Sequence, residues 1–115
     1  MAEDNLVNQK VGVRLLAKLG YRADLAANGV EVLEALRRQT YDLILMDIQM
    51  PEMDGREATR RIQAEWPQEE RPRIVALTAH AHDEARKLCV EAGMDDYVTK
   101  PVRLEDLIQM VTTQV

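Results

Sequence analysis

Five residues in this sequence carry side chains that could bind a charged group and take part in its transfer. The acidic pair Glu3-Asp4 stands near the start, and Asp47, Thr78 and Lys100 each follow a short segment of strand-like sequence. Crowded carboxylates raise one another's pKa unless a cation offsets their charge, and oxygen ligands favour a hard ion such as Mg²⁺. A lysine and a hydroxyl beside that ion could meet the oxygens of a phosphoryl group. If these residues meet in the fold, they predict a phosphoryl-binding pocket.

Apolar runs and helical spacing predict the elements that must bring these residues together. Continuous apolar runs before Asp47 and Thr78 are typical of strands covered on both faces of a parallel sheet. The predicted strands cover Tyr21–Ala27, Leu43–Met46, Ile74–Leu77 and Asp96–Thr99. Apolar residues at helical spacing predict helices over Leu6–Leu19, Val30–Arg38, from the cap Asp54 to about Trp66, Asp83–Glu91 and Leu104–Val111.

The alternation of strands and helices predicts how these elements assemble. Repeated βαβ units give a parallel sheet with right-handed crossovers, so the fold class is α/β. In open sheets of this class, ligands bind beyond the carboxyl ends of the strands. Asp47, Thr78 and Lys100 all stand at such ends. The topology therefore predicts that they line one site.

Four motifs occur in order along almost the whole chain. They are Glu3-Asp4-Asn5, Met46–Gly55, Ala76–Ala79 and Lys100-Pro101. Together they resemble the motifs of receiver domains of two-component response regulators. The opening Glu-Asp-Asn-x-x-Asn is similar to that of receivers in hybrid sensor histidine kinases. The resemblance implies a doubly wound, flavodoxin-like (βα)5 sheet with strand order 2-1-3-4-5.

The resemblance also implies roles for residues of the predicted pocket. Asp47 would accept a phosphoryl group, with Mg²⁺ held by Glu3, Asp4, Asp47 and the backbone carbonyl of Gln49. The donor would be a phosphohistidine on a sensor histidine kinase or a histidine phosphotransfer protein. Asp47 would attack phosphorus in line while the metal offsets charge, so catalysis is mostly positioning and electrostatics. Such a domain catalyses its own phosphorylation and dephosphorylation and is not a conventional enzyme.

The remaining implied roles concern signalling. Lys100 would pair with the phosphoryl group, and Thr78 would hydrogen-bond to it. As Thr78 moves, Tyr97 would turn inward from an exposed orientation and switch a protein-interaction surface on the fourth helix, fifth strand and fifth helix. The peptide bond between Lys100 and Pro101 could be cis, as in the family. His80, two residues after Thr78, could modulate hydrolysis of the acyl phosphate.

The start of the sequence departs from the family pattern. Receivers usually begin with several apolar residues that form an interior strand, whereas only Met1 and Ala2 precede Glu3. Loss of an interior strand leaves its neighbours with unpaired edges and removes buried aliphatic side chains. We therefore expect the first strand to be truncated or missing. The chain could be a fragment of, or related to, a longer hybrid kinase or response regulator, exchange strands in a homodimer, or place its first residues differently.

Composition narrows the class of protein. A chain of 115 residues with 46% apolar content suits a single domain over residues 1–115, and a formal charge of -5 argues against direct binding to nucleic acid or an anionic membrane. The single cysteine, Cys89, excludes an internal disulfide and favours a reducing compartment. The longest strongly apolar run, Leu43–Met46, is too short to cross a bilayer, so we expect a cytoplasmic location.

Two other functions stay open from the sequence. A metal-dependent phosphohydrolase resembling the haloacid dehalogenase group would also form an aspartyl phosphate. Such an enzyme would require a second acid two residues after Asp47, but Gln49 occupies that position. An interaction module that has lost phosphorylation would lack Asp47, Lys100 or the acidic pair, and all of them are present.

Overall fold

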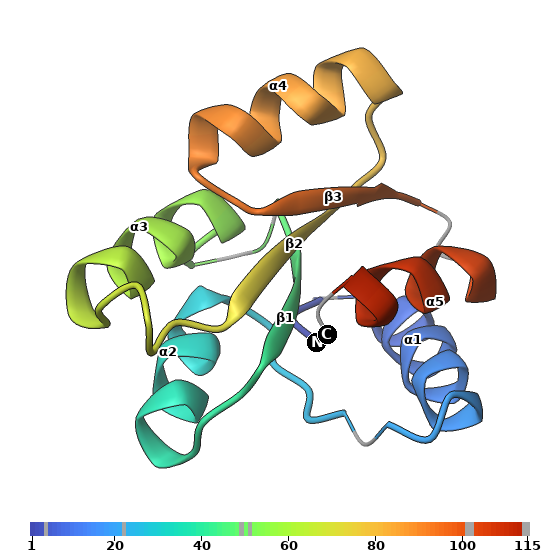
Figure 1. The fold of residues 1–115 in the computed structure, drawn as a ribbon, viewed down its shortest axis with the longest axis horizontal. Helices are drawn as coiled ribbons and strands as arrows, with labels where there is room; N and C mark the ends of the chain where they lie inside the picture. The colour runs from blue at the N-terminus through green and yellow to red at the C-terminus, as the bar shows by residue number, and fades with distance from the viewer. Residues whose placement is uncertain (4, 22, 49, 51, 101–102, 114–115) are drawn as a thin grey trace.

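The computed structural model describes residues 1–3, 5–21, 23–48, 50, 52–100 and 103–113. Three strands form a parallel sheet in the order β1-β2-β3 (Figure 1). They are β1 (Leu43–Asp47), β2 (Arg73–Thr78) and β3 (Asp96–Thr99). The register aligns Met46 with Ala76, and Ala76 with Tyr97. The last three of the four predicted strands are therefore confirmed.

Helices cover both faces of this sheet. In the described part of the chain they are α1 (Leu6–Lys18), α2 (Gly29–Arg38), α3 (Gly55–Glu65), α4 (His82–Ala92) and α5 (Leu104–Thr113). α2, α3 and α4 lie on one face, and α1 and α5 lie on the other (Figure 1). This two-sided cover explains the continuous apolar runs of the strands and confirms the predicted α/β class. None of these helices has the length and apolar character needed to span a membrane.

Alternate strand positions supply two separate cores. Met46 and Ala76 point to the face covered by α2, α3 and α4 and pack among buried residues of those helices. Leu45 and Leu77 point to the opposite face, where they pack with Leu107 of α5. Because each strand contributes to both cores, its backbone is held firmly and its last residue has a fixed position.

Local sequence sets where several helices begin and end. Asn5 caps α1 by accepting a hydrogen bond from the backbone N of Asn8 at 3.1 Å. Asp54 caps α3 in the same way, accepting from the backbone N of Glu57 at 3.0 Å, as predicted. Gly93 follows α4 with a φ of 77°, a left-handed conformation that glycine adopts without a steric penalty.

The first three residues pair on both sides, at the place expected for the interior first strand. Ala2 is fully buried and forms isolated parallel bridges with Ala26 and Met46. Its backbone N donates to Leu45 O at 2.7 Å, and Ala26 N donates to Met1 O at 3.0 Å. Ala2 therefore lies between the two segments that would flank a first strand, while the full order 2-1-3-4-5 stays a prediction.

The prediction of a strand over Tyr21–Ala27 is wrong for the residues described there. Among residues 21 and 23–27, only Ala26 forms a sheet bridge. A strand needs a hydrogen-bonding partner along its length. Met1–Glu3 provides a backbone partner only beside Ala26. Residues 21 and 23–25 therefore do not form a ladder of sheet hydrogen bonds.

Candidate functional site

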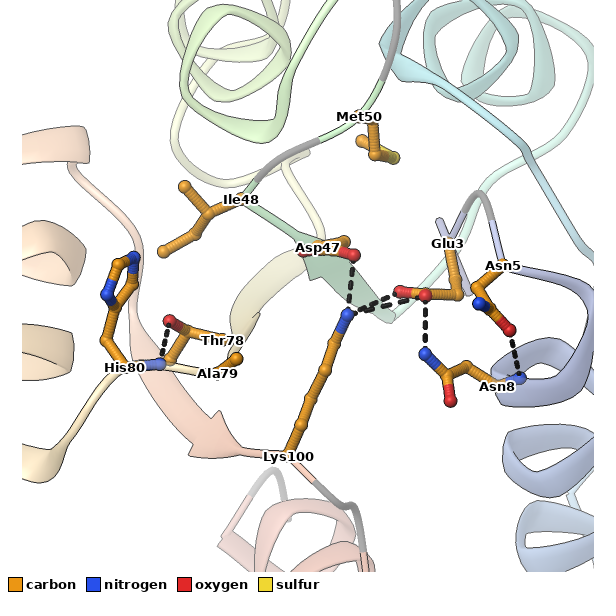
Figure 2. Close-up of a pocket in the computed structure, with 10 residues that line it drawn as sticks. All are labelled: Glu3, Asn5, Asn8, Asp47, Ile48, Met50, Thr78, Ala79, His80 and Lys100. Carbon is orange, nitrogen blue, oxygen red and sulfur yellow. Dashed lines mark hydrogen bonds and ion pairs between the residues drawn. The ribbon is translucent and has the colours of Figure 1, made fainter.

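A cleft of about 590 Å³ opens at the carboxyl end of the sheet (Figure 2). Asp47 is the last residue of β1, Thr78 is the last residue of β2, and Lys100 directly follows β3. The cleft is lined by Glu3, Asn5, Asn8, Asp47, Ile48, Met50, Thr78, Ala79, His80 and Lys100. The structure thus brings together Glu3, Asp47, Thr78 and Lys100, as the topology predicted.

The ammonium group of Lys100 sits between two carboxylates (Figure 2). Its Nζ lies 2.6 Å from Asp47 Oδ2 and 3.0 and 3.3 Å from the two oxygens of Glu3. Asp47 is 6% exposed and Glu3 is 1% exposed, so neither acid has much water to solvate its charge. Buried charges require a partner, and here one cation serves two anions. The trio keeps a net negative charge when all three groups are ionised.

Burial and mutual proximity shift the pKa values of this trio. Burial raises the pKa of Asp47 to about 6; the nearby Glu3 carboxylate adds to the rise, and Lys100 opposes it. Burial also acts to raise the pKa of Glu3, but hydrogen bonds with Asp47, Asn8 and Lys100 outweigh burial and lower it. Burial acts to lower the pKa of Lys100, whereas its bonds to the two acids outweigh burial and raise it. Lys100 therefore stays charged, and Asp47 takes up a proton before Glu3 does.

The loop after β1 folds back tightly onto Asp47. Gly55 N donates to Ile48 O at 2.9 Å as α3 begins. A Cβ on Gly55 would collide with the backbone oxygen of Asp47 and lie 3.1 Å from Ile48 Cα. Only glycine lets α3 start this close to the end of β1. Glu52, within the same loop, has a φ of 63°, which is uncommon for a residue with a side chain.

Thr78 is held at the floor of the cleft by the backbone around it. Its Oγ1 accepts a hydrogen bond from His80 N at 3.1 Å, and its backbone oxygen accepts one from Lys100 N at 2.7 Å. The second bond fixes where the chain leaves β3 and so aims the lysine side chain at Asp47. His80 also lines the cleft, with its Nδ1 3.5 Å from a carboxylate oxygen of Glu84.

Tyr97 lies on the same face of the sheet as Thr78. The register pairs it with Ala76, two residues before Thr78, and side chains two apart on a strand share a face. Tyr97 is half-buried and packs against the core beneath α2, α3 and α4. The structure therefore differs from the expected exposed orientation, because this core offers the ring apolar contacts. Its switching role stays a prediction.

Two side chains of α1 support Glu3 and were given no role from the sequence. Asn8 Nδ2 donates to Glu3 Oε1 at 2.9 Å, and Gln9 Nε2 donates to the backbone oxygen of Glu3 at 2.6 Å. The available signal was the cap at Asn5, which places Asn8 in the first turn of α1, beside the residues that precede the helix. Asn8 therefore helps to fix how the Glu3 carboxylate faces the cleft.

Three predicted site residues, Asp4, Gln49 and Pro101, lie outside the described residues. In the described ranges, no three acidic, histidine or cysteine side chains gather closely enough to hold a metal ion. Two of the predicted metal ligands, Glu3 and Asp47, do meet around a cation, the Lys100 ammonium. Their donor atoms are all oxygens and their joint charge is negative, which fits a hard ion such as Mg²⁺.

Comparison with known proteins decides the family. The family profile described as the response regulator receiver domain matches residues 1–112. The chain belongs to this family. Histidine protein kinase 1 of Candida albicans is 44% identical over 121 residues; the match covers 97% of this chain and 5% of the kinase. The receiver domain therefore spans a small part of the length of that curated relative.

Solved structures show the same receiver fold. The receiver domain of sensor histidine kinase PA1611 from Pseudomonas aeruginosa is 42% identical with a TM-score of 0.87, covering 98% of this chain and 92% of that one. It was solved with a magnesium ion coordinated in its active-site cleft. A second match, with 32% identity and a TM-score of 0.85, is a co-crystal structure of the Saccharomyces cerevisiae phosphotransfer protein Ypd1 and the Ssk1 receiver domain; it covers 96% of this chain and 83% of that one.

These matches establish the fold and the signalling class of this receiver. It has the flavodoxin-like fold of receivers and belongs to the two-component phosphorelay class of signalling domains, not to the conventional enzymes. The motifs that carry the resemblance therefore belong to a member of the family.

Proposed function

We propose that this receiver accepts a phosphoryl group from a phosphohistidine on the carboxylate of Asp47. The observation that carries the proposal is the position of Asp47 Oδ2, in the cleft and 2.6 Å from Lys100 Nζ. An Asp47 oxygen would bond to phosphorus as the bond from phosphorus to the donor histidine nitrogen breaks, and that nitrogen would keep the electron pair. With a pKa of about 6, Asp47 is mostly ionised near pH 7 and can act as the nucleophile.

Lys100 and Thr78 would hold the transferred group in place. The Lys100 ammonium already pairs with Asp47, so a phosphoryl oxygen bound there would come within its reach. Thr78 Oγ1 accepts a hydrogen bond from His80 N, which leaves its own hydrogen free to be donated to a second phosphoryl oxygen. Both contacts favour the charge distribution of the transition state and need no covalent step of their own.

Glu3 and Asp47, with Asp4 and the backbone carbonyl of Gln49, would bind Mg²⁺. When bound, the ion would supply positive charge that offsets the phosphoryl oxygens. The support for this site is its all-oxygen donor set and the cation that the two buried acids already share. Asn8 would keep the Glu3 carboxylate turned towards the ion through its hydrogen bond to Oε1.

The phosphodonor would dock at the rim of the cleft beside α1. Leu6 and Val7, in the first turn of α1, are 70% and 68% exposed. They directly follow Asn5, which lines the cleft. Exposed apolar side chains next to a reactive group favour protein docking. A histidine kinase or a phosphotransfer protein, the class to which Ypd1 belongs, would present its histidine to Asp47 from this side.

The output would arise from a change at Thr78 that reaches Tyr97. Both residues lie on the same face of the sheet, so movement of Thr78 towards a phosphoryl oxygen would open space beside Tyr97. A further inward turn of the half-buried Tyr97 ring would alter the surface of α4, β3 and α5. That surface already exposes Ile108 of α5, which suits a protein partner. Phosphorylation would then shift the population between two surfaces.

Intact-mass measurement after incubation with acetyl phosphate and Mg²⁺ tests the proposed function. Wild type should gain about 80 Da, the mass of one phosphoryl group, and should not gain it when EDTA removes the metal. Asp47→Asn should gain nothing. Asp83→Asn is the matched control, because Asp83 is fully exposed on α4, away from the cleft, and this variant should react like wild type. An adduct on folded Asp47→Asn equal to that of wild type would contradict the proposal.

A further inference from the structure

One side of α1 carries three cations that no acid neutralises. Lys10, Arg14 and Lys18 stand at every fourth position of the helix and are all exposed. Within the described ranges, none of the three forms an ion pair. On α2, by contrast, the exposed Arg37 pairs with Glu65 at 2.6 Å. Because the whole chain has a formal charge of -5, this stripe of unpaired positive charge locally reverses the sign of the surface.

Exposed apolar side chains lie on the same side of the helix. Leu6, Val7 and Val11 are 70%, 68% and 44% exposed. Helix residues succeed one another at about 100°, so an arc of about 140° holds all six residues of what we call the α1 face: Leu6, Val7, Lys10, Val11, Arg14 and Lys18. Leu16 falls outside this arc and is buried in the core beneath α1. The α1 face is therefore turned away from the core and combines apolar with basic side chains.

The α1 face starts at the rim of the cleft and leads away from it. Asn5 lines the cleft and caps α1 directly before Leu6. With a rise of about 1.5 Å per residue, Lys10, Arg14 and Lys18 follow Leu6 along the helix axis at roughly 6, 12 and 18 Å. α5 packs beside α1 without covering this face (Figure 1). A protein that reaches into the cleft past Asn5 would therefore cover the α1 face as well.

The charge of the α1 face selects among the partners that could cover it. Carboxylates on a partner would meet the three cations, whereas a basic surface would be repelled. An anionic membrane could also attract basic and apolar side chains on one helix. A membrane, however, is a broad plane that would meet more of the molecule, and the molecule's charge of -5 opposes this approach. A protein can place its acids opposite the cations alone, so the observations favour an acidic protein surface.

We propose that the α1 face recognises a phosphodonor protein that carries a row of acidic side chains, around an apolar centre, beside its phosphohistidine. A donor helix that runs along α1 with an acid at every fourth residue matches the spacing of about 6 Å between Lys10, Arg14 and Lys18. The cations steer the encounter and set its register, while the apolar side chains of the α1 face add contact area. The inference rests on the proposed function and adds the chemistry of the donor.

Transfer from phosphorylated Ypd1 tests this inference, because Ypd1 forms a complex with a receiver domain that is 32% identical to this chain. The second-order rate should fall at least roughly tenfold as salt rises from about 0.05 to about 0.5 M, because screening weakens steering. The double variant Lys10→Gln, Arg14→Gln should be at least roughly fivefold slower than wild type at low salt. Arg86→Gln, Lys87→Gln is the matched control, because it removes the same charge from exposed positions of α4. It should react nearly like wild type.

Acetyl phosphate separates this inference from the proposed function, because it has no protein surface to dock. Wild type and both double variants should react with it at the same rate and share one melting midpoint, since the changed side chains are exposed. No reaction of folded wild type would overturn the proposed function and, with it, this inference.

Where acetyl phosphate does react, three results would overturn the inference alone. They are no transfer from Ypd1, equal slowing of the two double variants, and a rate that does not depend on salt. Wild type should also not bind vesicles that contain phosphatidylserine. Binding to these vesicles that Lys10→Gln, Arg14→Gln abolishes would assign the α1 face to a membrane and would likewise overturn the inference.

Discussion

Lys100 Nζ lies 2.6 Å from Asp47 Oδ2, and the same ammonium group also contacts Glu3. One cation thus balances two buried acids, and a net negative charge is left over. Burial and the neighbouring Glu3 carboxylate raise the pKa of Asp47 although Lys100 opposes the rise, and the negative charge that is left over fits a further hard cation. The same three groups also hold the carboxyl end of the sheet together. Changes to them should therefore affect the free energy of unfolding as well as phosphorylation.

Asp47→Asn should change how stability depends on pH. The pKa of Asp47 is raised to about 6, above its ordinary value of about 3.9, so between these values the folded chain holds a proton that the unfolded chain has released. The stabilisation from this group is present below about pH 4 and is lost as the pH rises through about 6. The variant has no carboxyl group at this position, so its stability does not fall in this way. Its free energy of unfolding minus that of wild type should therefore rise by up to about 3 kcal/mol between pH 4 and 7.

Urea unfolding of both proteins across this pH range makes the comparison. The lowered pKa of Glu3 acts in the opposite direction, but Glu3 is present in both chains and partly cancels from the difference. A constant difference between the two proteins, or one that shrinks as the pH rises, would show that the Asp47 carboxylate is not the titrating group.

Lys100→Met should destabilise the fold and prevent stable phosphorylation. Removal of the ammonium leaves two buried carboxylates without a cation, and breaking a buried ion pair costs about 3 to 5 kcal/mol. Part of that loss should return at pH 5, where Asp47 is protonated, or when Mg²⁺ is added. Chemical unfolding with and without Mg²⁺ measures it. Lys87→Met, at an exposed position of α4, is the matched control and should behave like wild type.

Asn8→Ala should weaken Mg²⁺ binding more than it weakens the fold. Asn8 bonds the carboxylate of Glu3, and a hydrogen bond to a charged group is worth about 1.5 to 3 kcal/mol, or roughly tenfold or more in affinity. Gln9→Ala is the control, because Gln9 bonds only the backbone oxygen of Glu3. Calorimetric titration with MgCl₂ compares the two. Equal losses of affinity would mean that Asn8 supports the local backbone and does not orient the carboxylate.

Gly55→Ala should disturb Asp47 through the backbone alone. The added methyl group would collide with the Asp47 carbonyl, and overpacking of this kind costs about 1 to 3 kcal/mol. We expect a lower melting midpoint and slower phosphorylation at saturating Mg²⁺. Gly20→Ala separates crowding from backbone strain, because Gly20 has a φ of 84° and open space around it. That control should lose stability but keep the rate of phosphorylation.

Sequence reasoning succeeded where pattern and topology agree. Continuous apolar runs located β1 and β2, and the rule that ligands bind at the carboxyl ends of parallel strands placed Asp47 and Thr78 in one cleft. Helix signals also held, since Asp54 caps α3 and Gly93 ends α4. In each case a local rule and the global fold required the same answer.

The errors arose where a partner distant in sequence decides the local structure. Tyr21–Ala27 reads as a strand, but the short pairing offered by Met1–Glu3 leaves a bridge only at Ala26. No local pattern encodes the hydrogen bond from Asn8 to Glu3, because it depends on how α1 turns against the residues before it. Likewise, the packing of Tyr97 follows from its register with Ala76, which the sequence of β3 alone does not contain.

The carboxyl group that receives the phosphoryl group can be identified chemically. After reaction with acetyl phosphate and Mg²⁺, borohydride reduction and peptide mass mapping identify which carboxyl group formed the anhydride. We predict that modification falls on the peptide containing Asp47 and disappears when EDTA is present. Labelling of other acids with Asp47 untouched, or labelling that does not depend on the metal, would show that Asp47 is not a metal-dependent phosphoryl acceptor.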